Sequence, residues 1–112
     1  MSCTLASQTL IDLFEKQVKR SPNLYAVISD SEKITYQELY IRAQELASQL
    51  NLRVNGPTSL IAICGQRSLD FIIAILGTLI TGAAYVPIDP LYPPHTLKYI
   101  LKDVQPSLLI NI

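Results

Sequence analysis

Apolar residues recur at helical spacing in the first part of the chain. A first amphipathic helix is predicted to start at Thr9, a good N-cap residue, and to end before Ser21-Pro22-Asn23. Its apolar stripe consists of Leu10, Leu13, Phe14 and Val18. Residues 1–8 are expected to form a disordered N-terminal tail.

A hairpin and a second helix are predicted next. Tyr25–Ile28 is a short strand candidate, and Ile34-Thr35 begins the return strand after a polar turn. The run Thr35-Tyr36-Gln37-Glu38 is a capping box, in which the threonine hydroxyl accepts from a backbone amide and Glu38 reaches back to the threonine amide. Apolar residues then follow at steps of three and four as far as Leu50, which predicts a helix.

From this point strands and helices alternate. We predict strands at Ser59–Cys64, Tyr85–Ile88 and Leu108–Ile110, a helix at Leu69–Ile80 capped by Ser68, and a helix from Pro93 or Pro94 to Val104. Alternation at this spacing is typical of an α/β fold with a parallel sheet and right-handed crossover helices.

The Leu69–Ile80 helix is apolar nearly all round, so it must be buried on every side or lie in lipid. Phe71–Ile88 holds 18 residues without a charge, which touches the lower bound for a membrane span. Gly82 and Pro87 interrupt this stretch, and we favour a helix that stops at Gly82 followed by a strand at a sheet edge, at its own end or beside a bulge. A domain of this size supplies too little protein to cover both faces of such a helix.

Composition excludes several classes of partner. The chain has 112 residues, of which 49% are hydrophobic and only 16% charged, with nine acidic and nine basic residues. The net charge of zero gives no electrostatic case for binding nucleic acid or an anionic membrane. No signal peptide pattern is evident, so a cytoplasmic location is expected.

Residues with reactive side chains do not add up to an active site. Ser68 reads as a helix cap, Asp89 as a turn residue, and Arg67 as a loop charge or a salt-bridge anchor. His95, the only histidine, has no partner nearby in the sequence, and no glycine-rich phosphate loop is present. We therefore assign no catalytic and no cofactor-binding residue.

The two cysteines are also unremarkable. Cys64 reads as a small buried hydrophobic residue, and Cys3 lies near the terminus, so a disulfide is not expected. One histidine and two dispersed cysteines do not make a zinc site, and no metal site is assigned.

Two motifs resemble those of the adenylate-forming (AMP-binding) superfamily, especially the amino-acid adenylation domains of nonribosomal peptide synthetases. Ile34–Leu39 resembles the first core motif of that family, and Leu79–Asp89 resembles the second. Ile80 and Thr81 stand where the second motif usually has lysine and alanine. The resemblance covers essentially the whole chain from about Thr9.

The resemblance implies that residues 9–112 are a truncated N-terminal subdomain, an incomplete portion of the adenylation-domain fold. In that family both motifs are largely structural, and the phosphate loop and the catalytic lysine come later. The complete domain would use ATP and Mg²⁺ to form an aminoacyl-AMP for transfer to a carrier-protein thiol. This chain is expected to be inactive alone, and its residues do not indicate which amino acid the complete domain selects.

Two other hypotheses stay open at this point. The chain could be one half of a split adenylation enzyme, completed by a partner chain that supplies the remainder. It could instead be a non-enzymatic interaction module that buries its apolar face in a partner or by self-association.

Overall fold

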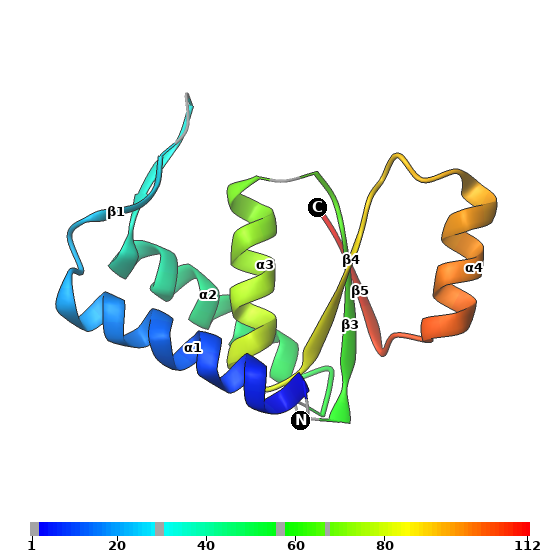
Figure 1. The fold of residues 1–112 in the computed structure, drawn as a ribbon, viewed down its shortest axis with the longest axis horizontal. Helices are drawn as coiled ribbons and strands as arrows, with labels where there is room; N and C mark the ends of the chain where they lie inside the picture. Colours follow the sequence, from blue (N-terminus) through cyan, green and yellow to red (C-terminus); the bar gives the residue numbers. More distant parts are fainter. Residues whose placement is uncertain (1–2, 29–30, 56–57, 67) are drawn as a thin grey trace.

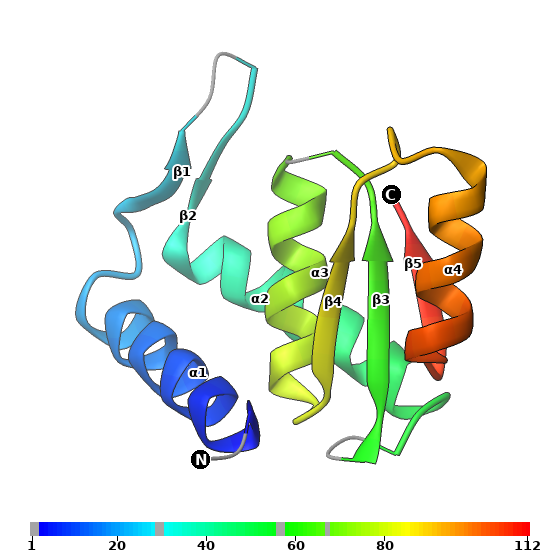
Figure 2. The same ribbon diagram turned by 45° about the vertical axis from the view of Figure 1, so that its right-hand side comes forward.

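The computed structural model describes residues 3–28, 31–55, 58–66 and 68–112 of the chain (Figure 1). Strands form two sheets in this part of the chain. A hairpin pairs β1 (Tyr25–Ile28) with β2 (Lys33–Thr35) in antiparallel fashion, with an irregularity between Tyr25 and Val27. The hairpin stands away from the rest of the fold, at the upper left of Figures 1 and 2. The predicted hairpin is confirmed.

The second sheet is parallel and has three strands. β3 (Leu60–Cys64) lies in the middle, flanked by β4 (Ala84–Ile88) and β5 (Leu108–Asn111). Both pairings are parallel. Pro87 therefore lies in an edge strand, where its missing N–H removes no bond to a second neighbour.

Helices cover both faces of this sheet (Figures 1 and 2). α3 (Leu69–Ile80) connects β3 to β4, and α4 (Pro94–Val104) connects β4 to β5. The second connection runs back past β3, and since such crossovers are right-handed, the reversal puts α4 on the opposite face from α3. α2 (Tyr36–Asn51) packs on α3, and α1 (Cys3–Arg20) lies outside them. The predicted α/β fold with crossover helices is confirmed.

The main core lies between the parallel sheet and the pair α2 and α3. Its buried members are Leu50, Ile61, Ile63, Ala74 and Ala83. A smaller core lies under the hairpin and contains Ile34, Leu39 and Leu69. Gly77 allows α2 and α3 to approach closely, because a Cβ there would lie 2.9 Å from Cδ2 of Leu46.

The helix ends follow their local sequence. The Glu38 amide donates to Oγ1 of Thr35 at 3.2 Å, and the Thr35 hydroxyl donates to the Glu38 carboxylate at 3.0 Å. The capping box thus forms where predicted, although the carboxylate accepts from the hydroxyl rather than from the threonine amide. Ser68 caps α3 by accepting from the Phe71 amide at 3.3 Å. Gly82 follows α3 with φ at 88°, in the left-handed region that glycine adopts without strain.

The predicted start of the first helix is wrong, since α1 begins at Cys3 and not at Thr9. Leu5 and Ala6 favour the helical conformation, so the helix can extend on the N-terminal side of Thr9. The preference of threonine for the N-cap position, about 1 kcal/mol, is too small to fix the start of the helix at Thr9. The division of the chain at residue 9 into a tail and a subdomain stays a prediction.

α1 is attached to α2 by an aromatic cluster and a hydrogen bond. The Phe14 ring lies 5.9 Å from the Tyr40 ring and 6.3 Å from the Tyr36 ring. The Tyr40 hydroxyl donates to the Glu15 carboxylate at 3.1 Å. Burial and the neighbouring Glu15 carboxylate together raise the pKa of Tyr40 above its ordinary value.

Candidate functional site

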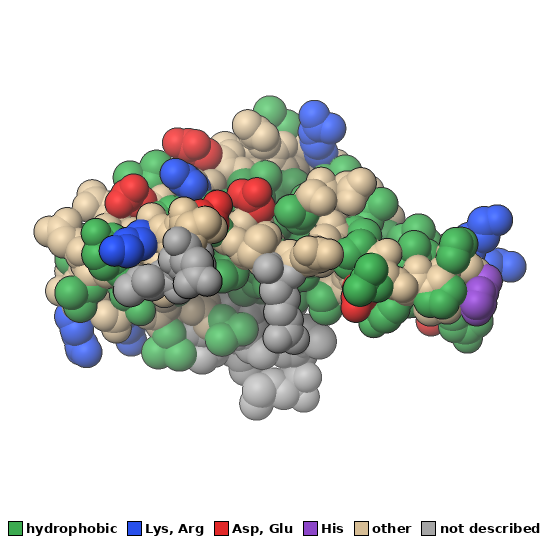
Figure 3. Space-filling view, turned by 90° about the horizontal axis from the view of Figure 1, so that it is seen from above, with side chains coloured by type: hydrophobic (Ala, Val, Ile, Leu, Met, Phe, Trp, Pro, Cys, Tyr) green, Lys and Arg blue, Asp and Glu red, His purple; other side chains and the backbone are tan. Residues whose placement is uncertain are grey.

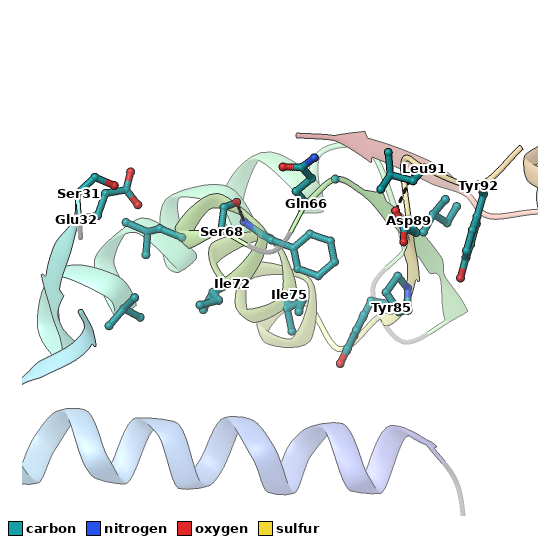
Figure 4. Close-up of a pocket in the computed structure, with 16 residues that line it drawn as sticks. Ser31, Glu32, Gln66, Ser68, Ile72, Ile75, Tyr85, Asp89, Leu91 and Tyr92 are labelled. Carbon is teal, nitrogen blue, oxygen red and sulfur yellow. Dashed lines mark hydrogen bonds between the residues drawn. The ribbon is translucent and has the colours of Figure 1, made fainter. Parts of the chain in front are cut away.

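A groove of about 1280 Å³ opens on the described part of the chain (Figure 4). It extends from the hairpin, along the N-terminal half of α3, to β4 and the loop that follows β4. The lining residues are Val27, Ser31, Glu32, Gly65, Gln66, Ser68, Leu69, Phe71, Ile72, Ile75, Tyr85, Pro87, Ile88, Asp89, Leu91 and Tyr92.

The floor of the groove is apolar. Phe71, Ile72 and Ile75 of α3 and Tyr85 of β4 face it, and all four are only half-buried. The loop after β4 adds two further apolar side chains at the rim, with Leu91 80% exposed and Tyr92 39% exposed. Apolar surface thus continues from the floor of the groove to its edge.

The groove reaches the carboxyl end of β3 and β4, where open parallel sheets usually bind ligands. Two of its polar side chains, Asp89 and Ser68, form hydrogen bonds with the backbone there. Oδ1 of Asp89 accepts from the Leu91 amide at 2.9 Å, and Oγ of Ser68 accepts from the Phe71 amide in the cap of α3. These groups shape the backbone of a turn and a helix end.

The structure brings only some of the sequence candidates together. Ser68 and Asp89 line the same groove, in the structural roles predicted for them. His95 lies exposed in the first turn of α4 and is not among the lining residues. Cys64 is a free, half-buried thiol at the end of β3, less buried than expected. Arg67 lies outside the described residues.

Among the described residues, no group of three or more His, Cys, Asp or Glu side chains could hold a metal ion. The groove also offers no set of donors suited to the phosphates of ATP, since its lining is mainly apolar and its described charged residues are Glu32 and Asp89. The described residues therefore do not fit Mg²⁺ or ATP, and the expectation that this chain binds neither stays a prediction. No helix among the described residues has the length and apolar character needed to cross a bilayer.

The end of the molecule seen from above in Figure 3 shows a mixed surface. Most of the charged side chains visible on this face lie over the left-hand half and at the right-hand tip, and hydrophobic side chains are frequent between them. Eleven large hydrophobic residues are exposed in the described part of the chain: Leu10, Leu13, Leu24, Tyr25, Ile41, Leu52, Leu91, Tyr92, Tyr99, Leu109 and Ile112.

Sequence reasoning did not find the groove. Its floor is built from α3 and β4, and its far wall from a hairpin distant in sequence, so no local motif marks it. The one available signal was the helix that is apolar on all sides, because such a helix leaves an apolar stripe wherever its neighbours do not cover it.

The described residues thus form an α/β layer with an open apolar groove. The model of the AMP-binding enzyme family matches residues 14–111. The chain belongs to this family.

Two proteins with similar sequences show which kind of AMP-binding enzyme this chain resembles. Tyrocidine synthase 3 of Brevibacillus parabrevis is 42% identical over 104 residues, covering 93% of this chain and 2% of that protein. Malpinin synthetase of Mortierella alpina is 46% identical over 104 residues, covering 93% of this chain and 1% of that protein. The chain therefore spans only a small share of the length of the curated relatives it matches.

Solved structures agree with the sequence relatives. The N-terminal subdomain of Klebsiella oxytoca NpsA superposes with a TM-score of 0.83 at 30% identity, over 90% of this chain and 26% of that chain. The nonribosomal peptide synthetase FmoA3, with alpha-methyl-L-serine-AMP bound, gives a TM-score of 0.85 at 26% identity, over 91% of this chain and 12% of that chain. The resemblance to the N-terminal part of a nonribosomal peptide synthetase adenylation domain is confirmed.

Proposed function

We propose that this chain is the structural N-terminal part, over residues 9–112, of a domain that activates an amino acid with ATP. The complete domain would join the amino acid to AMP and release pyrophosphate, and the aminoacyl group would then pass to a carrier-protein thiol. The chain would supply a sheet and helix layer to that domain and no catalytic group, and it would act in the cytoplasm.

One observation carries this proposal: nine-tenths of the chain superposes on about a quarter of the NpsA N-terminal subdomain, at 30% identity. The polar groups of the groove are consistent with it, because Ser68 and Asp89 hold backbone in place. ATP and Mg²⁺ would then be held by residues outside this chain, and the selectivity for the amino acid would lie there as well.

A chimera tests the proposal. This chain would replace the matched part of NpsA, and pyrophosphate exchange would be measured with the substrate of the unmodified protein and with the common amino acids. We expect the chimera to keep measurable exchange and the substrate preference of NpsA, since the exchanged part would line no substrate pocket. The control is NpsA rejoined to its own segment at the same junctions.

Two outcomes would count against the proposal. A chimera that folds but has lost exchange, while the rejoined control is active, would favour a non-enzymatic interaction module. A chimera with a changed substrate preference would mean that this chain contributes to the substrate pocket.

A further inference from the structure

The parallel sheet has two edge strands, β4 and β5, which lie on opposite sides of β3 (Figure 2). In an edge strand, the main-chain groups of alternate residues point away from the sheet and have no partner strand. Another chain can pair with such an edge unless a proline, a charge or a bulge blocks it. The two edges of this sheet differ in that respect.

The outward edge of β4 is blocked by Pro87. The Ala84 amide and the Ile88 carbonyl bond to the residues that flank β3, at 3.2 Å and 3.3 Å. The main-chain groups of Ala84 and Ile88 therefore face β3, and by alternation those of Tyr85 and Pro87 point outward. Because proline has no N–H, this edge lacks a donor that a further strand would need.

The outward edge of β5 has no such block. The Ile112 amide donates to the last residue of β3 at 2.8 Å, and by alternation the main-chain groups of Ile110 also face β3. Those of Leu109 and Asn111 then point outward, each with an N–H and a C=O. The Ser107 amide, just before the strand, also donates to β3, so the regular alternation begins only with β5 itself.

The sequence of β5 also lacks the residues that protect an edge. Its four residues, LLIN, include no proline and no charged side chain, and its register with β3 runs without a bulge. Leu109 is 47% exposed and Ile112 is 45% exposed, so apolar side chains accompany the free main-chain groups. β5 is therefore the edge at which a further strand can add.

The side chains of β5 suit pairing with a second β5. In an antiparallel pair centred on Ile110, Leu108 lies opposite Ile112 of the second copy, and Ile110 lies opposite its own counterpart. These three residues share one face of the strand, so that row is apolar throughout. Leu109 then lies opposite Asn111, and these two residues, whose main-chain groups point outward, can exchange both hydrogen bonds.

We propose that two copies of this chain pair antiparallel through β5, about a two-fold axis at Ile110, and join their three-stranded sheets into one continuous sheet. Each copy contributes one short strand, which buries less than the roughly 800 Å² per partner of a standard interface. The dimer is therefore weak and forms in a concentration-dependent way. This inference goes beyond the proposed function and does not depend on it.

Sedimentation of the 112-residue chain over about a hundredfold range of concentration tests the proposal. Leu109→Pro gives β5 the outward proline that β4 already has, and Leu109→Lys places a charge on the same edge. The matched control is Leu52→Lys, which makes the same change at a leucine that is 87% exposed and lies after α2, away from the sheet. Melting curves show which variants are folded.

We expect the average mass of the unmodified chain to rise from 12.4 kDa toward twice that value as the concentration increases. Leu109→Lys and a folded Leu109→Pro should raise the dimer dissociation constant by at least about tenfold, and Leu52→Lys should leave it unchanged. Hydrogen exchange at the Leu109 and Asn111 amides should slow with increasing concentration, whereas exchange at the outward Tyr85 amide of β4 should not.

A chain that stays monomeric over the whole range would overturn the proposal. A dimer that persists in folded Leu109→Lys would also overturn it and would place the contact elsewhere, for example in the groove. Concentration-dependent protection at Tyr85 instead of Leu109 would assign the pairing to β4. None of these results bears on the proposed function, which pyrophosphate exchange by the chimera tests separately.

Discussion

The two faces of the parallel sheet are covered very differently. On one face, α2 and α3 enclose buried side chains and meet closely enough that Gly77 has no room for a Cβ. On the other face, α4 carries no buried residue, and its Tyr99 is 72% exposed. The difference follows the sequence, since α3 is apolar nearly all round and α4 is amphipathic.

The two helices differ in how completely their apolar sides are covered. α4 already presents a polar outer side, as a surface helix does. α3 is packed on α2 and on the sheet but opens to the groove along a third side, so its sequence is that of an interior helix. Stability should therefore depend strongly on α3 and weakly on α4.

The largest effect is expected from truncating a buried leucine of α3. Leu79 is 6% exposed, so Leu79→Ala should lower the free energy of unfolding by about 3 kcal/mol through lost burial and the cavity left behind. Leu101→Ala, at a half-buried position of α4, should cost about 1 kcal/mol. Urea denaturation measures both, and equal losses would mean that α4 is packed as tightly as α3.

A smaller effect is expected where α2 meets α3. Gly77→Ala puts a Cβ 2.9 Å from Cδ2 and 3.1 Å from Cβ of Leu46. The overlap costs about 1–3 kcal/mol, and the better helix propensity of alanine returns about 1 kcal/mol, so we expect a net loss of about 1 kcal/mol. In a Leu46→Ala background the contact with Cδ2 is gone and only the one with Cβ remains, so the same substitution should cost nearly nothing. An unchanged cost in that background would show that Leu46 is not the obstacle.

The first turns of α3 and α4 differ in the same way, because only α3 has a side-chain cap. Ser68→Ala removes the side-chain cap and should cost about 1 kcal/mol, whereas Ser68→Thr keeps a hydroxyl acceptor and should cost less. α4 begins without any side-chain cap, so its first turn should be unaffected. Hydrogen exchange should become faster at the first amides of α3 only, and equal acceleration in α4 would argue that the two helices unfold as one unit.

The smallest effect concerns α1, the outer helix on the crowded face. The pKa of Tyr40 is raised in the folded chain, so the folded state holds this proton more tightly than the unfolded state. The stabilisation is fully present below the ordinary tyrosine pKa of about 10 and is lost as pH rises above it. Tyr40→Phe should remove this alkaline decrease in stability. Identical pH profiles for both proteins would rule out a contribution from Tyr40.

Elements with strong local signals were predictable from the sequence. The Thr35 capping box, the Ser68 cap and the Gly82 stop each depend on side chains within four residues, and the structure contains all three. The start of α1 was missed because a threonine that can cap a helix can also lie inside one.

The arrangement of the elements in space was harder to predict from the sequence. The alternation of helices and strands predicts a parallel sheet, but the order β4-β3-β5 depends on which edge the last crossover reaches. The left-handed residue Gln105, with φ at 49°, closes α4 without a glycine to mark the turn. The groove depends on a gap between the hairpin and α3, which no single segment encodes.

Pyrophosphate exchange by the isolated chain addresses the proposed role most plainly. Purified protein would be assayed with ATP, Mg²⁺ and each of the common amino acids, beside NpsA with its own substrate as a positive control. If this chain supplies structure and no catalytic group, no amino acid will produce exchange above background. Amino-acid-dependent exchange by the pure 112-residue chain would show instead that it contains an active site of its own.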